Sequence, residues 1–252
     1  MTRPFVLLST QRSGSTWVID MLNSHPSIVT YGELLLQDGR GRPPFGAQDR
    51  MFLQSYGLAH DYLPGSQFGK GFLFQYLDNI FETRPGISAT GFKLMYGQYG
   101  AFPHLQEYML SNNIYIAHLI RRNYLDIILS KEVATNRNIY HVDVADTTPI
   151  PAIKLNVSEL LNELDHHERT IQGARNKFYR MGLPYMEVFH EDLQSNQSAF
   201  NSILNFLKIE SDISRLTSPL RKIITVGHEE VIENYEQVKQ ELAGTRFSSL
   251  LK

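Results

Sequence analysis

The sequence contains no cysteine, which excludes disulfide bonds, thiolate nucleophiles and cysteine-ligated metals. It also lacks a long apolar run. The stretch after Arg3 extends only from Phe5 to Leu8, far short of the ~18 apolar residues of a membrane span and too short for a signal peptide. These absences predict a cytoplasmic chain without a membrane span.

A strong charge of either sign is missing as well. The 24 lysines and arginines nearly balance the 26 aspartates and glutamates, so the formal net charge is -2. Such a chain has no global field that would recruit nucleic acid or an anionic membrane, and any anion site must be local. The length of 252 residues and the hydrophobic content of 42% predict one large α/β domain over residues 1–252.

Short β-rich runs alternate with longer helical patterns along the chain. The predicted strands cover 4–9, 28–31, 89–95, 114–120 and 185–190. The predicted helices cover 15–24, 101–112, 123–136, 157–181 and a segment around Phe200 to Leu207. This alternation predicts a parallel sheet with helices on both faces and ligands at the carboxyl ends of the strands.

The stretch LLSTQRSGSTWVIDML, residues 7–22, joins a predicted strand to a predicted helix through small hydroxyl residues. Gly14 allows close backbone approach, Ser13, Ser15 and Thr16 add hydroxyl donors, and Arg12 adds a permanent charge. A loop of this kind at a helix start is typical of an anion site. The alternative is an ordinary helix start capped by Ser15 or Thr16.

A nucleoside triphosphate such as ATP or GTP is a poor candidate for that anion. The loop lacks the G-x-x-x-x-G-K-[ST] pattern that binds such phosphates. A second stretch, HLIRRNYLDIILSKEVA at 118–134, again joins a predicted strand to a predicted helix. There Arg122 and Ser130 could bind a second phosphate, with Asp126 on the same helix face as Ser130. The alternative is a solvated charge pair with Ser130 packed on the sheet.

Together the two stretches resemble the nucleotide-binding motifs of the sulfotransferases that use 3′-phosphoadenosine 5′-phosphosulfate. The segment RSGSTW at 12–17 matches the family's P-[KR]-S-G-[ST]-[ST]-W, with Gln11 in place of the proline. The segment RNYLDIILS at 122–130 matches R-N-x-x-D-x-x-x-S at every fixed position. A third element, a strand followed by [YF]-E-D-L, appears as VFHEDL with His190 at the aromatic position.

The resemblance implies a P-loop-like three-layer fold with a central parallel sheet flanked by helices. It further implies an enzyme that uses 3′-phosphoadenosine 5′-phosphosulfate as donor and requires no metal. The residues implied for the 5′-phosphosulfate are Arg12, Ser13, Gly14, Ser15 and Thr16, with Arg12 also neutralising the leaving group. Trp17 matches a position that stacks on adenine, although a core aromatic would fit as well. Arg122 and Ser130 would hold the 3′-phosphate.

Within the family, HPSIVTYGELL and GFKLMYGQ are similar to the bacterial carbohydrate and glycolipid branch, in which a glutamate at the position of Glu33 is proposed as base. We therefore expect Glu33 to be the catalytic base, with His25 as its rival. Lys93 would contact the sulfuryl group or extend from the sheet to solvent. Residues 37–69, rich in glycine, proline and aromatics, are expected to form the acceptor wall or a lid over a glycan, glycolipid or other small acceptor.

Two other functions stay open. One is a nucleotide kinase or NTPase of related topology, and the other is a nucleotide-binding protein without turnover. Metal-site spacing is absent from two short histidine-containing runs, His166-His167-Glu168 and His228-Glu229. Both are expected on solvated faces.

Overall fold

The computed structural model describes residues 2–35, 67–137, 152–210, 212–220 and 226–251. The chain divides into two compact units. The first unit comprises Met1–Ile120 and Lys177–Thr217, and the second comprises Arg121–Asn176 and Ser218–Lys252. The single domain over 1–252 stays a prediction. The predicted acceptor loop lies outside the described residues except for 67–69, which begin a helix instead.

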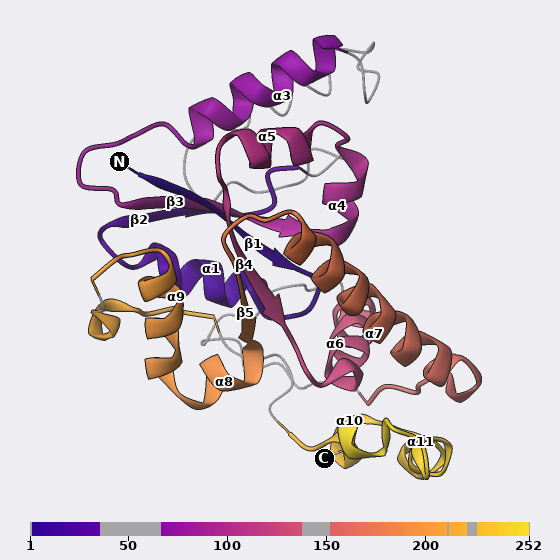
Figure 1. The fold of residues 1–252 in the computed structure, drawn as a ribbon. Helices are drawn as coiled ribbons and strands as arrows, with labels where there is room; N and C mark the ends of the chain where they lie inside the picture. Colours follow the sequence, from indigo (N-terminus) through magenta and orange to yellow (C-terminus); the bar gives the residue numbers. More distant parts are fainter. Residues whose placement is uncertain (1, 36–66, 138–151, 211, 221–225, 252) are drawn as a thin grey trace. The chain divides into compact units, whose positions relative to one another are not determined.

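A five-stranded parallel sheet forms the centre of the first unit, in the order β2-β3-β1-β4-β5 (Figure 1). The strands are β1 (Arg3–Ser9), β2 (Ile28–Tyr31), β3 (Ala89–Met95), β4 (Tyr115–Ile120) and β5 (Tyr185–Phe189). All five predicted strands are confirmed, 28–31 and 89–95 to the residue. Because β1 pairs with β3 on one side and β4 on the other, the loop after β1 leaves from the middle of the carboxyl edge.

Helices flank the sheet in the first unit and make up most of the second. The first unit contains α1 (Ser15–Asn23), α3 (Gln67–Ile80), α4 (Tyr96–Ala101), α5 (Leu105–Ser111), α8 (His190–Ser195) and α9 (Phe200–Phe206). The second contains α6 (Tyr124–Arg137), α10 (His228–Val231) and α11 (Tyr235–Leu242), and α7 (Val157–Arg180) crosses the boundary between the units. Among the described helices none is long and apolar enough to span a membrane.

The predicted helix over 101–112 is α5, which begins only at Leu105 because a turn at Pro103 precedes it. Proline has no backbone N–H and its ring crowds the preceding turn, so it cannot occupy a helix interior without breaking it. Before this turn lies α4, which was not predicted and which begins directly after Met95, the last residue of β3.

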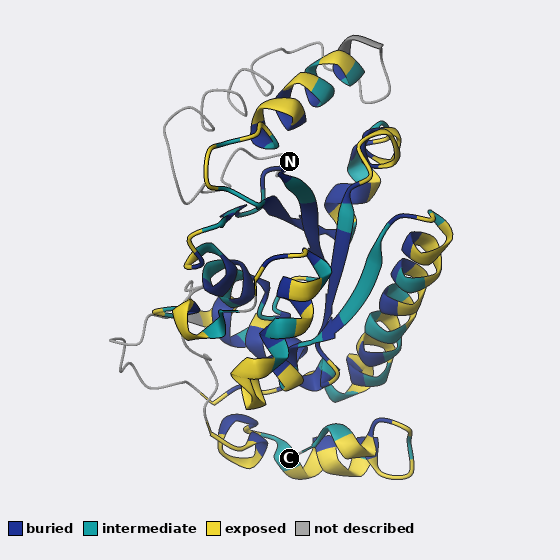
Figure 2. Cartoon of the chain, turned by 60° about the vertical axis from the view of Figure 1, so that its left-hand side comes forward, coloured by how far each residue is buried: buried dark blue, intermediate teal, exposed yellow. Residues whose placement is uncertain are grey.

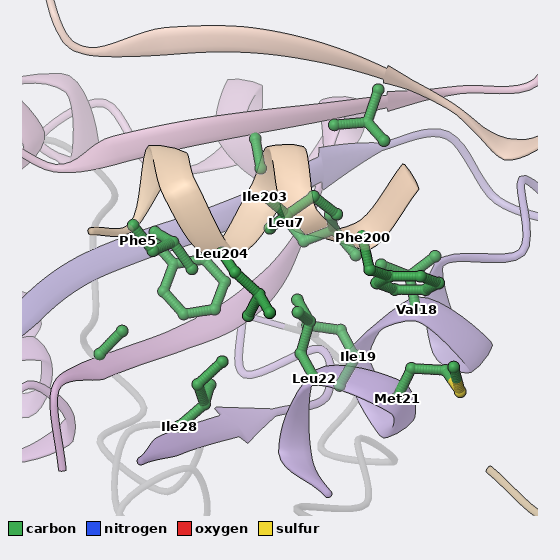
Figure 3. Packing of buried hydrophobic residues seen from close by; sticks show 14 of the residues in the cluster. Phe5, Leu7, Val18, Ile19, Met21, Leu22, Ile28, Phe200, Ile203 and Leu204 are labelled. Atoms are coloured by element: carbon green, nitrogen blue, oxygen red, sulfur yellow. The ribbon is translucent and has the colours of Figure 1, made fainter. Parts of the chain in front are cut away.

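Apolar side chains cover both faces of the sheet. On one face Phe5 and Leu7 of β1 pack with residues of α1 and α9 (Figure 3). On the other face Phe92 of β3 lies 5.9 Å from the ring of Phe81, which stacks on Tyr108 of α5 at 6.3 Å. The central strands β1 and β3 are therefore buried on both sides, while α3 and α5 each expose one flank (Figure 2). This arrangement confirms the predicted three-layer fold.

A buried histidine links the strands beyond their backbone ladder. His118 of β4 is fully buried, and its two ring nitrogens lie 2.6 Å from the Tyr96 hydroxyl and 2.7 Å from the Tyr185 hydroxyl. The Tyr185 hydroxyl donates to Glu187 at 3.0 Å. These bonds satisfy the imidazole inside the sheet, as a buried polar ring requires.

The second unit has its own apolar core. That core contains Leu125, Ile128, Leu129, Val133, Ile153, Leu155, Leu160, Leu164, Val231, Ile232, Val238, Leu242 and Phe247. Ile153 and Ile232 form a parallel bridge, and the Asn234 side chain accepts from the backbone N–H of Leu155 at 2.9 Å. The C-terminal segment is thereby attached to the chain before α7.

We expect Gly91→Ala to destabilise the first unit. A Cβ at Gly91 would lie 2.5 Å from the Phe5 ring, so the ring would have to move. Such overpacking costs about 1–3 kcal/mol. In urea unfolding, Gly91→Ala should therefore lose stability and recover part of it when combined with Phe5→Leu. Gly71→Ala is the control: it lies on an exposed turn of α3 with open space around it and should gain roughly 0.5–1 kcal/mol.

Candidate active site

The loop after β1 contains two residues in the left-handed region, Arg12 with φ of 61° and Gly14 with φ of 85°. For a non-glycine residue this conformation costs on the order of 1 kcal/mol, and such strain gathers at functional sites. Gly14 is the N-cap of α1 and has no side chain that could accept from the first N–H groups. Ser15 and Thr16 lie inside the helix, so the alternative in which one of them caps it is wrong.

The hydroxyl groups of the loop have different tasks. Ser13 is fully buried and donates to the carbonyl of Thr10 at 2.8 Å, which closes the loop on itself. Thr16 lies in the first turn of α1, and its Oγ1 accepts a hydrogen bond from Lys93 at 3.0 Å. The loop is thus held from within and linked to β3.

His190, in the segment VFHEDL that matches the third family element, packs on this loop. A Cβ at position 14 would lie 2.4 Å from its Nδ1, so only glycine fits at Gly14 for both backbone and steric reasons. The His190 ring also makes an edge contact with Trp17 at 5.8 Å between centroids, and Trp17 contacts Phe200 in the same way at 5.6 Å. Stacking of Trp17 on adenine stays a prediction.

Lys93 joins the loop to the candidate base. Its Nζ lies 3.0 Å from Thr16 Oγ1 and 2.8 Å from Glu33 Oε1. The other oxygen of Glu33 accepts a hydrogen bond from Gln98 at 2.9 Å. The side chains of Lys93 and Glu33 are only 9% and 18% exposed, so water screens their attraction little. Lys93 therefore contacts α1 and Glu33 rather than extending to solvent.

The two rival bases lie at opposite ends of β2. Glu33 follows the last residue of the strand by two positions, and His25 precedes the first by three. Since the strands are parallel, Glu33 is at the edge where the loop after β1 emerges, and His25 is at the amino edge. His25 is buried and accepts from the backbone N–H of Ser27 at 3.2 Å. Burial lowers the pKa of His25, and the positive charge of Arg215 lowers it further.

In the second unit, the motif 122–130 is built around a buried carboxylate. Asp126 accepts from Arg121 through Oδ2 and bonds His228 through Oδ1, both at 2.8 Å. Asn123 accepts from the backbone N–H of Asp126 at 3.1 Å, as an N-cap of α6, and its amide donates to the carbonyl of Leu250 at 2.8 Å. His228 is 3% exposed, so the expectation of a solvated face is wrong there.

The two residues predicted to bind the 3′-phosphate differ in exposure. Arg122 is exposed, and Ser130 in α6 is 7% exposed. The motif thus contains two kinds of residue. Asn123 and Asp126 organise the start of α6. Binding of the 3′-phosphate by Arg122 and Ser130 stays a prediction.

Sequence reasoning missed two contributors to these sites. Gln98 holds Glu33 from 65 positions away, and His228 holds Asp126 from 102 positions away. Neither contact has a local sequence signal. Across the described ranges, no group of three or more histidine, aspartate or glutamate side chains is arranged to hold a metal ion. The histidine pair of the second unit is not part of such a group. Burial lowers the pKa of His167, and the neighbouring His166 and Lys131 lower it further.

No protein-family model and no curated protein matches the sequence. Solved structures of similar fold include a sulfotransferase from Alicyclobacillus acidocaldarius, at 12% identity over 100% of this chain and 96% of that one, with a TM-score of 0.49. Mouse sulfotransferase SULT7A1 complexed with PAP has 11% identity over 98% and 86%, with a TM-score of 0.48. Sulfotransferase STF9 from Mycobacterium avium has 12% identity over 96% and 75%, with a TM-score of 0.43.

All three structures are sulfotransferases, the family whose nucleotide-binding motifs the segments 12–17 and 122–130 resemble. At identities of 11–12%, this likeness concerns the fold alone.

We expect Asp126→Ala to destabilise the second unit strongly. The change leaves the Arg121 guanidinium buried without its carboxylate, and breaking a buried ion pair in this way costs about 3–5 kcal/mol. Arg246→Ala is the control, because its pairs with Asp165 and Glu168 are exposed and should contribute much less. Denaturant unfolding gives the stability of each variant, and hydrogen exchange of the α6 amides reports the local loss. Equal small losses in the two variants would show that the cluster is not structural.

Proposed function

We propose that this chain is an enzyme that transfers a sulfuryl group from 3′-phosphoadenosine 5′-phosphosulfate to a hydroxyl acceptor. The observation that carries the proposal is the pair of contacts made by Lys93, to Thr16 in the anion loop and to Glu33 at the end of β2. They bring a cation, an anion-binding helix start and a carboxylate to one edge of the sheet. Sulfuryl transfer needs each of these groups.

The donor's 5′-phosphosulfate is assigned to residues 12–16. Helix α1 begins without an N-cap side chain, so its first N–H groups and the positive end of its dipole are available for an anion. Arg12 adds a charge that would neutralise the leaving 5′-phosphate. Trp17 would contact the adenine. The bends at Arg12 and Gly14 fit this assignment, because they turn the backbone at the helix start.

The 3′-phosphate is assigned to Arg122 and Ser130. An exposed arginine presents a fork of donors that matches a phosphate, and the hydroxyl in α6 adds a further donor. Asp126 would act indirectly, since both of its oxygens are engaged by Arg121 and His228.

In the reaction an acceptor oxygen forms a bond to sulfur as the bond from sulfur to the 5′-phosphate oxygen breaks. The acceptor hydroxyl loses its proton to Glu33, and the bisphosphate nucleotide leaves. Lys93, beside Glu33, would stabilise negative charge on the sulfuryl oxygens. We further propose that the acceptor is a carbohydrate or glycolipid and that residues 37–69 form its binding wall or lid.

We expect adenosine 3′,5′-bisphosphate to stabilise the protein more than AMP, since only the former has a 3′-phosphate. A ligand at about 100 times its Kd adds ~2.7 kcal/mol to the unfolding free energy. Arg122→Ala should remove the preference, at a binding cost of about 1.5–3 kcal/mol, whereas Arg169→Ala, another exposed arginine of the second unit, should keep it. Thermal shifts measured in EDTA test this. A larger shift with ATP and Mg²⁺ than with the bisphosphate would favour the kinase or NTPase alternative.

Glu33→Gln should lower turnover by about 10²–10⁴, because the amide keeps the shape of the side chain but cannot take a proton. Bisphosphate affinity should barely change, and Glu82→Gln, at an exposed glutamate of the same unit, should have no effect. Transfer of labelled sulfate to a panel of glycans and glycolipids provides the rate. If Glu33→Gln keeps a rate within about threefold of wild type while His25→Asn is inactive, the base is misassigned. Binding of the bisphosphate without any turnover would indicate the non-catalytic alternative.

A further inference from the structure

Gln98 contacts Glu33 through an amide that has only one possible orientation. Its Oε1 accepts from the buried backbone N–H of Met95 at 3.0 Å, so its Nε2 is the group that faces Glu33, at 2.9 Å from Oε2. In a flipped amide, Nε2 could not accept from the Met95 N–H and Oε1 could not donate to Glu33, so both bonds would be lost. Gln98 is 8% exposed, so water offers little replacement for either bond.

Both carboxylate oxygens of Glu33 are thus held from one short segment, residues 93–98. Lys93 at the end of β3 binds Oε1, and Gln98 in the first turn of α4 binds Oε2. Gln98 also reaches back to the backbone of the α4 N-cap, as in a capping box. The carboxylate plane is therefore tied to the start of a helix rather than left to rotate.

We propose that Gln98 is a positioning residue for Glu33, and that its N–H donor holds the carboxylate in the orientation needed to accept a proton. This inference rests on the proposed role of Glu33 as base. A carboxylate held by donors on both oxygens stays an acceptor, and its remaining lone pairs point in fixed directions.

The simpler explanation is that Gln98 only caps α4. The two explanations depend on different atoms of the same side chain. Capping needs Oε1, which accepts from Met95, whereas positioning needs Nε2, which donates to Glu33. Gln98→Glu keeps an oxygen for the cap and replaces the donor with a second oxygen. It therefore preserves the helix start and removes the feature under test.

The decisive measurement is the titration of Glu33, followed by ¹³C NMR of protein labelled at the glutamate carboxyl carbon and assigned by loss of the signal in Glu33→Gln. In Gln98→Glu two carboxylates face each other and compete for one proton, so the Glu33 midpoint should rise by about one pH unit or more. Gln106→Glu is the matched control, because Gln106 is exposed in α5 and accepts from the Tyr99 hydroxyl through the oxygen that the variant retains. An unchanged Glu33 midpoint in Gln98→Glu would overturn the proposal.

The rate profile gives a second readout. In Gln98→Glu the acidic limb of the kcat profile should move to higher pH in parallel with the NMR midpoint, with bisphosphate affinity near that of wild type. The double variant Glu33→Gln/Gln98→Glu exchanges the two side chains and so removes the like-charge pair. It should stay inactive, because its carboxylate is at position 98 and no longer at position 33, where Lys93 binds it. Wild-type turnover in the exchange variant would also overturn the proposal. Absence of sulfuryl transfer in the wild type would instead refute the proposed function, while the NMR comparison would still decide whether Gln98 controls Glu33.

Discussion

The ion pair between Lys93 and Glu33 is the contact on which the candidate site depends. The Lys93 ammonium lies 2.8 Å from the carboxylate and 3.0 Å from the Thr16 hydroxyl, with little exposure to water. A cation in such a position needs its partners, because an uncompensated buried charge is costly. The end of β2, the end of β3 and the first turn of α1 are therefore coupled. A change at any of the three residues should alter the positions of the other two.

The sheet makes this contact possible through its strand order. β3 lies between β2 and β1, so a residue at its carboxyl end can reach the segments that follow both neighbours. Gly91 allows the Phe5 ring to pack across β3, on the face that also carries α1. The absence of a side chain at position 91 leaves room for this packing. The parallel register of β1 and β3 brings Lys93 and the loop after β1 to the same edge of the sheet.

The second motif combines folding and binding in one short segment. Asn123 and Asp126 form the start of α6 through a cap and a buried charge cluster with Arg121 and His228. Arg122 and Ser130 carry the proposed phosphate contacts. A motif of this kind is specific because it specifies a local conformation and a donor set together.

Local sequence patterns were sufficient for the strands and for the bounds of α1, α6, α7 and α9, because hydrophobic periodicity, glycine and proline act over a few residues. Pro103, which delays the start of α5 relative to the predicted helix, is a local signal of the same kind. Glu33 was proposed as the base from its family position, and Lys93 was singled out at its strand. The contacts of Glu33 with Lys93 and Gln98 come from the tertiary structure alone. The same holds for His228 with Asp126, 102 positions apart. Such contacts follow from strand order and from packing between distant segments, and a short window of sequence contains neither.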